Sequence, residues 1–397
     1  MSSTWPSGQP GQPTPHANSA RIGDFMTRNA RILIVGGGIA GLTAAIALRQ
    51  RGFIPELVER AASWRVLGTG IVIQPNAMRL LRELDVANHL EQTGAAVRRF
   101  QFLSKSGEVL SEIDLTELWS GVDSGVAIER SELQKALLRK VDCARCRLGV
   151  AVTSLNHREG SVSIGFSDGG TGDYDLAIGA DGIGSTVRAL AIGGTAPRHC
   201  GQAAWRALAS IRRRGADEIQ FWLGDGSFFT TYPVGQERTY GCGYVAEPAR
   251  AQAPAEGRLA RFRDCFAAFG EPVRALLDSL THDDQIHCSA VESLELPEWR
   301  KGRVLLIGDA AHASSPMMGQ GGCMAVEDAT ILAELLETSP TVDAFSPRRR
   351  PRVDWVRAQS DALARSTLAP AAARDTIIKE RGAQAFRDRF APLLPAP

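Results

Sequence analysis

The hydrophobic positions near the start of the folded part alternate between strand-like and helix-like runs. Arg31–Val35 is rich in β-branched residues and leucine, which predicts a buried parallel strand. Ile39–Arg51 places alanine and leucine at helical spacing, and Gly52 follows as a C-cap glycine. A second apolar run, Ile54–Val58, predicts the next strand. The order strand, glycine turn, helix and strand indicates an α/β unit with Rossmann-like character.

Strand-like and helix-like runs also occur later in the chain, whereas the N-terminal stretch has neither. Lys301–Gly308 predicts a turn followed by a buried strand, and Met324–Glu337 predicts a helix. Val162–Ile164 alternates and is followed by the turn residues Asp168–Gly170, which together indicate a hairpin. Met1–Asn29 is rich in Ser, Pro, Gly and Gln and shows no periodicity, so we expect a disordered extension there.

Composition narrows the class of protein. A length of 397 residues suggests two or three domains. The charge balance of 45 Lys+Arg against 44 Asp+Glu carries no sign of a nucleic-acid partner. Seven cysteines and no apolar leader before Arg31 predict free thiols in a reducing compartment, hence a cytoplasmic protein. Ile32–Leu48 lacks charge, but Gly36–Gly38 interrupts it, so we expect no integral membrane segment.

Metal chemistry is not expected. The histidines are scattered at no ligand spacing. Cys143 and Cys146 form a lone C-x-x-C pair, without the second pair that a zinc site needs or the thioredoxin-like context of a redox site.

The glycines after the first strand predict a dinucleotide site. Gly36 permits a tight turn, Gly38 lets a pyrophosphate approach the backbone, and Gly41 lets the helix pack close to the strand. The helix N-terminus offers unpaired N–H groups to that pyrophosphate. Glu59, at the end of the second strand, can accept hydrogen bonds from a ribose. The candidate contacts are Gly36, Gly38, Ile39, Ala40, Gly41, Glu59 and Arg60. This segment alone does not separate NAD from FAD, and a glycine-rich turn with a solvated glutamate is the alternative.

A later segment favours a flavin. Asp309 ends a buried strand, where its carboxylate can accept hydrogen bonds from a polyol such as ribitol. The turn Gly319–Gly322 leads into a helix, and its backbone suits an anion, such as the negative charge of a reduced flavin. Asp181 and Gly182 follow another strand, where an ordinary turn remains the alternative interpretation.

Together these segments resemble a known family. Ile34–Gly41, Ile178–Gly182 and Leu306–His312, in this order, are similar to the fingerprint of FAD-dependent aromatic hydroxylases. These are single-component flavoprotein monooxygenases that include p-hydroxybenzoate hydroxylase, urate hydroxylase and zeaxanthin epoxidase. The resemblance covers approximately residues 30–365 and implies FAD as the cofactor.

The resemblance also implies an architecture. We expect an α/β fold with a FAD-binding Rossmann-like domain of the glutathione-reductase type, an inserted mixed or antiparallel β-sheet substrate domain, and a C-terminal helical segment. The expected divisions are a disordered extension at 1–29, a discontinuous FAD-binding domain at 30–95, 121–195 and 287–345, a substrate-binding sheet at 96–120 and 196–286, and a helical segment at 346–397.

Particular residues take roles from the resemblance. Ala127–Gln134 matches the family helix whose arginine meets the FAD phosphate and ribose, which places Arg130 there. The segment from Gly68 to Ala77, with Gly70, is similar to the one that passes beside the isoalloxazine ring. Asp181 is implied to lie near the flavin and to affect use of the nicotinamide cofactor. The remaining implied flavin contacts are Gly308, Asp309, Pro316, Gly319, Gly321 and Gly322.

The activity implied is hydroxylation of a small aromatic or nitrogen-heterocyclic substrate. It uses NAD(P)H as co-substrate, O2 and a C4a-hydroperoxyflavin, in a monomer or homodimer. Arg206, Tyr232 and His312 are candidate catalytic residues, although packing, surface or capping roles are open for each. Two alternatives remain: a flavoenzyme of the same fold that epoxidises alkenes or reduces double bonds, and a flavin-binding redox sensor or sequestering protein without turnover.

Overall fold

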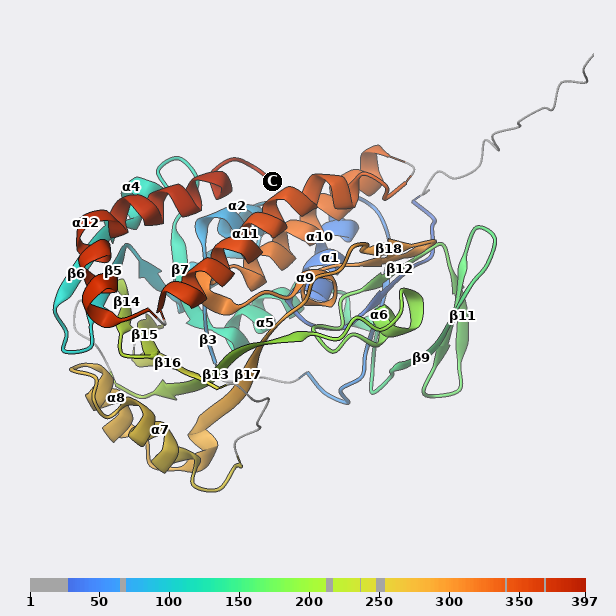
Figure 1. The fold of residues 1–397 in the computed structure, drawn as a ribbon. Helices are drawn as coiled ribbons and strands as arrows, with labels where there is room; N and C mark the ends of the chain where they lie inside the picture. Colours follow the sequence, from blue (N-terminus) through green and yellow to red (C-terminus); the bar gives the residue numbers. More distant parts are fainter. Residues whose placement is uncertain are drawn as a thin grey trace, which may run out of the picture.

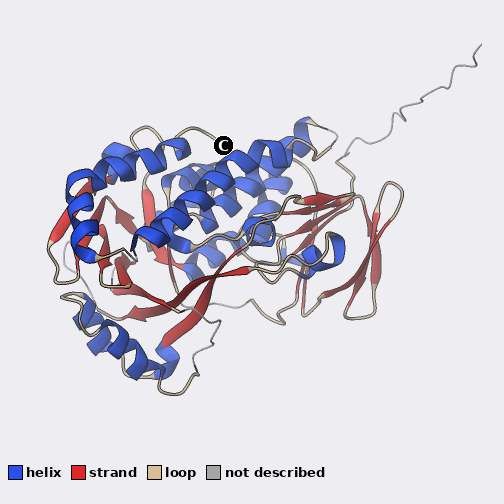
Figure 2. Cartoon of the chain, viewed as in Figure 1, coloured by secondary structure: helices blue, strands red, loops and turns tan. Residues whose placement is uncertain are grey.

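The computed structural model describes residues 28–64, 69–211, 217–235, 237–247, 254–339, 341–367 and 369–397 (Figure 1). Of the predicted N-terminal extension, residues 1–27 lie outside the described residues, as does Gly68 of the segment expected beside the isoalloxazine ring. The described strands form four sheets, coloured red in Figure 2.

The first sheet contains the predicted Rossmann-like unit. Its six strands follow the order β18-β19-β12-β1-β2-β8, and all neighbours are parallel except β18 and β19. The strands are β1 (Ile32–Val35), β2 (Glu56–Glu59), β8 (Cys146–Leu148), β12 (Leu176–Gly179), β18 (Arg300–Lys301) and β19 (Val304–Leu306). Helix α1 (Ile39–Gln50) follows β1 and packs against α10 (Gly321–Thr338). The sheet therefore brings the three glycine-containing segments to neighbouring strand ends.

Element boundaries differ from the predicted ones for local reasons. The second strand begins at Glu56 rather than Ile54, just after Pro55, which has no N–H to donate to a ladder. The strand predicted within Lys301–Gly308 is confined to Val304–Leu306, because Gly302 and Gly308 adopt positive φ angles of 56° and 57°. Helix α10 begins at Gly321, three residues before the predicted start.

A mixed sheet of seven strands faces the first sheet's glycine turns. Its order is β17-β13-β16-β15-β14-β5-β6, antiparallel except between β14 and β5. The strands are β5 (Arg99–Ser104), β6 (Val109–Asp114), β13 (Arg198–Ala209), β14 (Glu218–Leu223), β15 (Ser227–Val234), β16 (Arg238–Ala246) and β17 (Ile286–Ser293). The expected mixed substrate sheet is present, and it extends past residue 286, where we placed its boundary.

The two faces of this sheet have different partners. Phe229 packs against Phe262 and Phe266 of α7 (Arg258–Phe266), and α8 (Val273–Ser279) lies beside it. Its neighbour Phe228 points the other way and stacks on Tyr244 with ring centroids 4.3 Å apart. Gly243 is required on the α7 side, because a Cβ atom there would lie 2.2 Å from the Phe266 ring. The alternation thus leaves one face for the helices and one for a cavity.

The remaining described strands form two sheets of three strands each. The hairpin predicted near Val162 is confirmed as β10 (Val162–Phe166) and β11 (Thr171–Tyr174), which pair with β9 (Val152–His157). The other sheet has the order β3-β7-β4, with β3 (Gly70–Ile73), β4 (Ala95–Val97) and β7 (Gly125–Glu129). Ala127–Gln134 is therefore not one helix: its buried, apolar start belongs to β7, and α5 (Arg130–Leu138) begins at Arg130.

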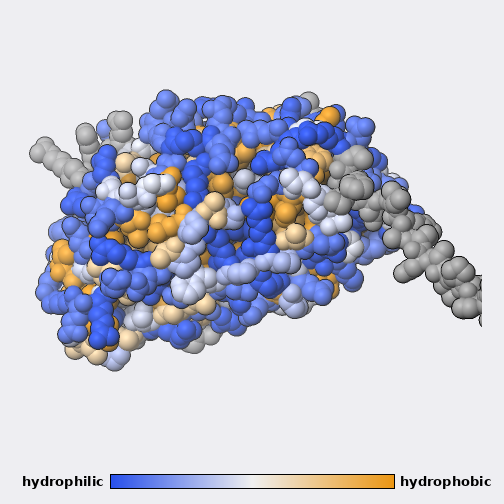
Figure 3. Space-filling model, turned by 90° about the horizontal axis from the view of Figure 1, so that it is seen from above, coloured by the Kyte–Doolittle hydropathy of each residue, from blue (hydrophilic) through white to orange (hydrophobic). Residues whose placement is uncertain are grey.

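The remaining helices cover the sheets, and α11 and α12 lie along the upper side of the molecule in Figure 1. They are α2 (Pro75–Glu83), α3 (Ala87–Thr93), α4 (Leu115–Leu118), α6 (Thr186–Ala191), α9 (Asp309–His312), α11 (Phe345–Thr367) and α12 (Ala371–Phe390), with a short 3-10 helix, η3 (Pro316–Met318). None of the described helices has the length and apolarity needed to cross a bilayer. The face drawn in Figure 3 is largely hydrophilic, with hydrophobic side chains gathered in separate areas.

Candidate active site

A cavity of about 1010 Å³ lies where the six-stranded and seven-stranded sheets meet. It is lined by segments far apart in the sequence: the start of α1, strand β3, the residues from Asp309 to Gly322, and the inner faces of β13 to β16. Of the predicted cofactor residues, it is lined by Gly38, Ile39, Ala40, Gly70, Arg130, Asp309, Pro316, Gly319, Gly321 and Gly322. The fold therefore gathers most of them around one space.

The three glycines of the first segment have the separate roles expected for a phosphate-binding turn. Gly36 has a φ of 111°, and a Cβ atom there would lie 2.4 Å from the Ala180 carbonyl oxygen. A Cβ at Gly41 would lie 1.9 Å from the Gly36 oxygen, so this glycine permits close packing of helix and strand. A Cβ at Gly38 would meet no described atom within 4 Å. The turn is thus closed on its protein side and open toward the cavity.

The start of α1 suits an anion. Gly38 is the N-cap residue, no described side chain caps the helix, and no acidic residue lies in its first turn. The first N–H groups of a helix have no intrahelical partner, and the helix dipole is positive at that end. A pyrophosphate beside Gly38 would satisfy both features. This end of the cavity therefore fits the diphosphate of a dinucleotide.

Glu59 and Arg60 lie beside the turn but do not line the cavity. One carboxylate oxygen of Glu59 accepts a hydrogen bond from the Gly37 N–H at 2.8 Å, and the other accepts one from the Ala61 N–H at 2.8 Å. Each oxygen keeps a lone pair for a further donor. Arg60 is exposed. The structure thus gives Glu59 a role in holding the glycine turn, and its contact with a ribose stays a prediction.

Asp309 presents a carboxylate to the cavity. It makes no hydrogen bond or ion pair with any described residue. Gly308, before it, has a φ of 57° and packs where a Cβ would lie 3.0 Å from the Ala40 Cβ. The turn therefore holds the start of α1 and the Asp309 carboxylate together, an arrangement that suits a ligand with both a diphosphate and a polyol.

The start of α10 forms the wall beyond Asp309. Gly319 is left-handed with a φ of 63°, and Gln320 is the N-cap residue. A Cβ at Gly321 would lie 3.9 Å from a carboxylate oxygen of Asp309, and one at Gly322 would lie 3.0 Å from the Ile71 side chain. No described side chain caps this helix end either. Its open N–H groups suit the negative charge of a reduced flavin ring.

The side chain of Arg130 is available to a ligand, whereas that of Asp181 is already bound to other protein groups. Arg130 begins α5, its backbone N–H donates to the Thr69 carbonyl, and its exposed side chain lines the cavity without an ion pair to a described residue. Asp181 accepts hydrogen bonds from the Ser185 hydroxyl at 2.5 Å and the Thr186 N–H at 2.7 Å, at the start of α6. It does not line the cavity, although its neighbours Ala180 and Gly182 do. The local geometry of Asp181 is that of a turn and helix cap.

His312 does not line the cavity. It is buried, its Nε2 lies 2.6 Å from a carboxylate oxygen of Asp328, and its ring lies 5.0 Å from that of Trp299. Asp328 also accepts hydrogen bonds from the Gly308 N–H and from Arg349. Burial opposes the charge on Asp328, but His312 and Arg349 outweigh it and hold its pKa at about 2. This geometry supports a positioning role for His312 beneath the Gly308 turn rather than contact with substrate.

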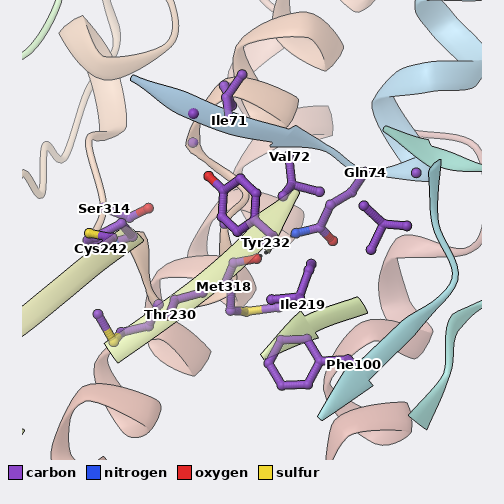
Figure 4. Close-up of a pocket in the computed structure, with 18 of the residues that line it drawn as sticks. Ile71, Val72, Gln74, Phe100, Ile219, Thr230, Tyr232, Cys242, Ser314 and Met318 are labelled. Carbon is purple, nitrogen blue, oxygen red and sulfur yellow. Dashed lines mark hydrogen bonds between the residues drawn. The ribbon is translucent and has the colours of Figure 1, made fainter. Parts of the chain in front are cut away.

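Arg206 and Tyr232 lie on the cavity face of the seven-stranded sheet. Arg206, on β13, donates a hydrogen bond to the Ser289 hydroxyl at 2.8 Å and makes no ion pair with a described residue. Figure 4 shows Tyr232 at the centre of the pocket, with Val72 and Gln74 on one side and Met318 on another. Both candidate residues therefore line the cavity, and we call the part of it around Arg206 and Tyr232 the chamber.

Two further tyrosines belong to the chamber and were not found from the sequence. The Tyr240 ring lies 4.9 Å from that of Tyr232, and Tyr244 lies on the same strand two positions beyond Cys242. Burial raises the pKa of Tyr232, Tyr240 and Tyr244 well above the usual value, so the phenols stay protonated and can act as hydrogen-bond donors. The period of two from Tyr240 through Cys242 to Tyr244 was the available signal.

Further lining residues were not named as candidate site residues from the sequence. The Gln74 side chain donates to the Met318 carbonyl at 2.7 Å and accepts from the Gln320 side chain at 2.8 Å, which ties β3 to the turn before α10. Helix α12, for which the sequence suggested no chemistry, contributes Phe386, Arg389 and Phe390 to the lining. The spacing of four between Phe386 and Phe390 places both on one helix face, and only that spacing pointed to burial.

Among the described residues, no group of three or more His, Cys, Asp and Glu side chains lies close enough together to hold a metal ion.

Comparison with known proteins gives consistent matches. The FAD binding domain family matches residues 29–356. The 2-heptyl-3-hydroxy-4(1H)-quinolone synthase of Pseudomonas aeruginosa (strain UCBPP-PA14) is 33% identical over 342 residues, covering 83% of this chain and 87% of that protein. The 3-amino-4-hydroxybenzoate 2-monooxygenase of Streptomyces cremeus is 32% identical over 353 residues, covering 86% and 88%.

A solved structure agrees over nearly the same length. A variant of Klebsiella pneumoniae HpxO, complexed with FAD, superposes with a TM-score of 0.81 at 26% identity, covering 91% of this chain and 95% of that chain.

Proposed function

This chain belongs to the FAD-dependent aromatic hydroxylases, and from that premise we propose that it hydroxylates a small aromatic or nitrogen-heterocyclic compound with NAD(P)H and O2. One observation carries the proposal. The open flavin-binding turns at Gly38, Asp309 and Gly321 and the chamber of Arg206 and Tyr232 line the same cavity. A cofactor held by the first group would therefore share a space with a substrate held by the second.

The residues fit FAD at each of its parts. Gly38 and the start of α1 would bind the diphosphate, the Asp309 carboxylate would bind the ribityl hydroxyls, and the start of α10 would lie at the ring. Arg130 is available to the phosphates or ribose. Bound FAD would supply electron transfer from NAD(P)H and the activation of O2.

The chain's own residues then bind and orient the substrate. Arg206 has donor groups beyond its bond to Ser289, and these can hold a carbonyl, phenolate or carboxylate oxygen of the ring. Tyr232 and Tyr240 have protonated phenols that can donate to a second polar group. Met318, Val72 and Ile219 give the ring apolar contacts and exclude water (Figure 4). Their combination favours a flat ring with one or two polar substituents.

The nicotinamide cofactor is proposed to react without a domain of its own, because the sequence holds no second glycine fingerprint. A cytoplasmic location is proposed on the seven cysteines, none of which forms a disulfide among the described residues.

The decisive experiment is a panel of phenols, hydroxybenzoates, hydroxypyridines and quinolones added to the FAD-loaded protein under air. We expect at least one to accelerate NAD(P)H oxidation and to yield a product heavier by one oxygen atom, with the label from oxygen-18 gas. Arg206→Gln should raise KM for that compound while FAD stays bound.

Other outcomes separate the alternatives. A product that gains hydrogen but no oxygen would favour a reductase of the same fold. Binding across the panel with no change in NAD(P)H oxidation would favour a sensor or sequestering protein and contradict the proposed hydroxylation.

A further inference from the structure

The cavity has a second end, away from the flavin-binding turns, whose wall includes the C-terminal helix. Helix α12 begins at Ala371, beyond residue 356 where the family match ends. Phe386 and Phe390 from its last turns nevertheless line the cavity, and their exposed fractions are 6% and 5%. This wall therefore comes from a part of the chain that lies beyond the family match.

Six phenylalanines make this end a continuous aromatic surface. We call them the aromatic arm: Phe100, Phe102, Phe221, Phe228, Phe386 and Phe390. The Phe386 ring lies 4.7 Å from Phe100 and 4.5 Å from Phe390. On the sheet side, Phe221 and Phe228 stack with centroids 4.9 Å apart. The arm thus runs from α12 across β5 and β14 to β15, next to the chamber of Tyr232.

The chemistry of the arm differs from that of the chamber. Arg206, Tyr232 and Tyr240 offer charge and hydrogen bonds, whereas the six rings of the arm carry no polar atom. A polar group placed against these rings would find no hydrogen-bond partner on them to replace water, and Arg389, next to Phe390, is the charged residue that α12 adds to the lining. An apolar group would gain contacts with rings that are already ordered by packing on each other. The two ends therefore suit two different parts of one ligand.

We propose that the substrate carries an apolar extension on its reacting ring, and that this extension lies in the aromatic arm against α12. The inference rests on the proposed function for the reacting ring, which Arg206 and Tyr232 hold at the flavin end. The arm then selects for the length of the extension. Each buried methylene should improve affinity about fourfold until the arm is filled.

A homologous series tests the proposal. The probes are phenol and 4-ethyl-, 4-butyl- and 4-hexylphenol, titrated into the FAD-loaded protein and followed by the flavin absorbance change and by calorimetry. We expect Kd to fall about fourfold per methylene over the early members. Equal Kd across the series, or no binding by any member, would overturn the proposal.

Two variants locate the binding. Ile219, on β14 beside Phe100 in Figure 4, lines the cavity, so Ile219→Trp should fill the arm and bring the ratio of phenol to hexylphenol Kd close to one. Ile377→Trp makes the same change at a position on α12 that is 59% exposed, and it should keep the wild-type ratio.

Phe386→Ala enlarges the arm instead, and it should weaken the binding of hexylphenol about fivefold or more relative to phenol. Unchanged ratios in both Ile219→Trp and Phe386→Ala would place the alkyl chain elsewhere and refute the inference.

Different results would refute the proposed hydroxylation and the proposed role of the aromatic arm. If affinity rises with chain length but no ring compound stimulates NAD(P)H oxidation, the arm stands and hydroxylation is refuted. If a short ring compound is hydroxylated and chain length has no effect, hydroxylation stands and the arm is refuted.

Discussion

At the scale of single residues, the polar groups of the site divide by whether the protein already satisfies them. Glu59, Asp181 and His312 are each bound to neighbouring protein groups, whereas Asp309 and Arg130 have no partner among the described residues. A charged side chain held near a cavity without a partner is available to a ligand. We therefore expect substitutions at the second group to affect FAD more than folding.

Asp309→Ala tests this division most directly. It removes a carboxylate that makes no intraprotein bond, so apoprotein stability should change by less than about 0.5 kcal/mol. The hydrogen bonds lost to the ribityl chain should weaken FAD about tenfold to a hundredfold. FAD fluorescence titration and the thermal transition of the apoprotein measure the two effects, and Asp264→Ala is the control, because Asp264 on α7 is exposed and does not line the cavity. Equal FAD affinity in Asp309→Ala would show that this carboxylate does not face the cofactor.

Asp328 should behave in the opposite way, because it is wholly buried and satisfied. Its pKa of about 2 lies below the ordinary 3.8, so its ionisation stabilises the fold by about 2 kcal/mol. Because the folded pKa is depressed, that contribution is complete above pH 4 and is lost as the pH falls toward 2. In Asp328→Asn, we expect a loss of about 3–5 kcal/mol at pH 7, because His312 loses its carboxylate partner and Arg349 keeps only Glu327, and a flatter decline of stability below pH 4.

Chemical denaturation at several pH values measures both effects. Asp343→Asn serves as the control, because Asp343 forms a surface ion pair with Arg300 and should cost less than about 1 kcal/mol. The same acid profile in Asp328→Asn and wild type would contradict the pKa argument.

At the scale of elements, the start of α10 borders the part of the cavity in which we propose that the flavin ring lies. Gly321 is the first residue of the helix, and its absent Cβ would point toward Asp309 across the cavity lining. Gly321→Val should therefore narrow this space, and we expect slower flavin reduction by NAD(P)H or loss of reducing equivalents as peroxide, with the adenosine end still bound. Stopped-flow reduction with a confirmed substrate is the measurement.

Gly194→Val is a matched control for this change, since Gly194 is exposed and a Cβ there would meet no described atom within 4 Å. Reduction at the wild-type rate in Gly321→Val would show that the ring does not lie against this helix end.

Elements were predictable from the sequence where local signals agreed. Ile32–Val35 and the helix after Gly38 were predicted nearly to the residue, because a β-branched run, a glycine turn and a helical period follow one another without conflict. Ala127–Gln134 was assigned to one helix, and the structure divides it at Arg130, since Val126–Ile128 pairs with β3 and β4. Strand pairing with distant segments overrode the local interpretation there.

At the scale of the whole molecule, the C-terminal segment contacts both the cofactor half and the substrate sheet, which lie far from it in the sequence. Arg352 on α11 donates to the Leu393 carbonyl, Arg79 on α2 donates to the Leu394 carbonyl, and the Trp119 ring packs on Phe390. The chain end is therefore fixed to the cofactor half and the substrate sheet together. It is a structural part of the site and also a wall of the aromatic arm.

Truncation at the C-terminal end should lower stability, whereas truncation at the N-terminal end should not. Removing residues 369–397 would expose Phe100 and Phe102, so we expect reduced soluble yield and a lower Tm. Removing residues 1–27, whose composition offers little apolar surface to bury, should leave FAD binding and Tm unchanged. Soluble expression, FAD content and Tm of the two truncated proteins, compared with the full chain, check both statements. Normal stability without α12 would contradict the closure of the cavity by that helix.

The sequence by itself determined the cofactor turns and the family. Gly36, Gly38 and Gly41 have roles fixed by backbone geometry within a few residues of each other, so their spacing carried the information. Only the tertiary structure decided which polar side chains have no partner in the described protein and which residues line the cavity. Asp181 and Asp309 both follow a strand, yet one caps α6 and the other faces the cavity. Tyr240, Phe386 and Phe390 reach the cavity because distant strands and a terminal helix pack together, and pairings between segments so far apart leave no local pattern in the chain.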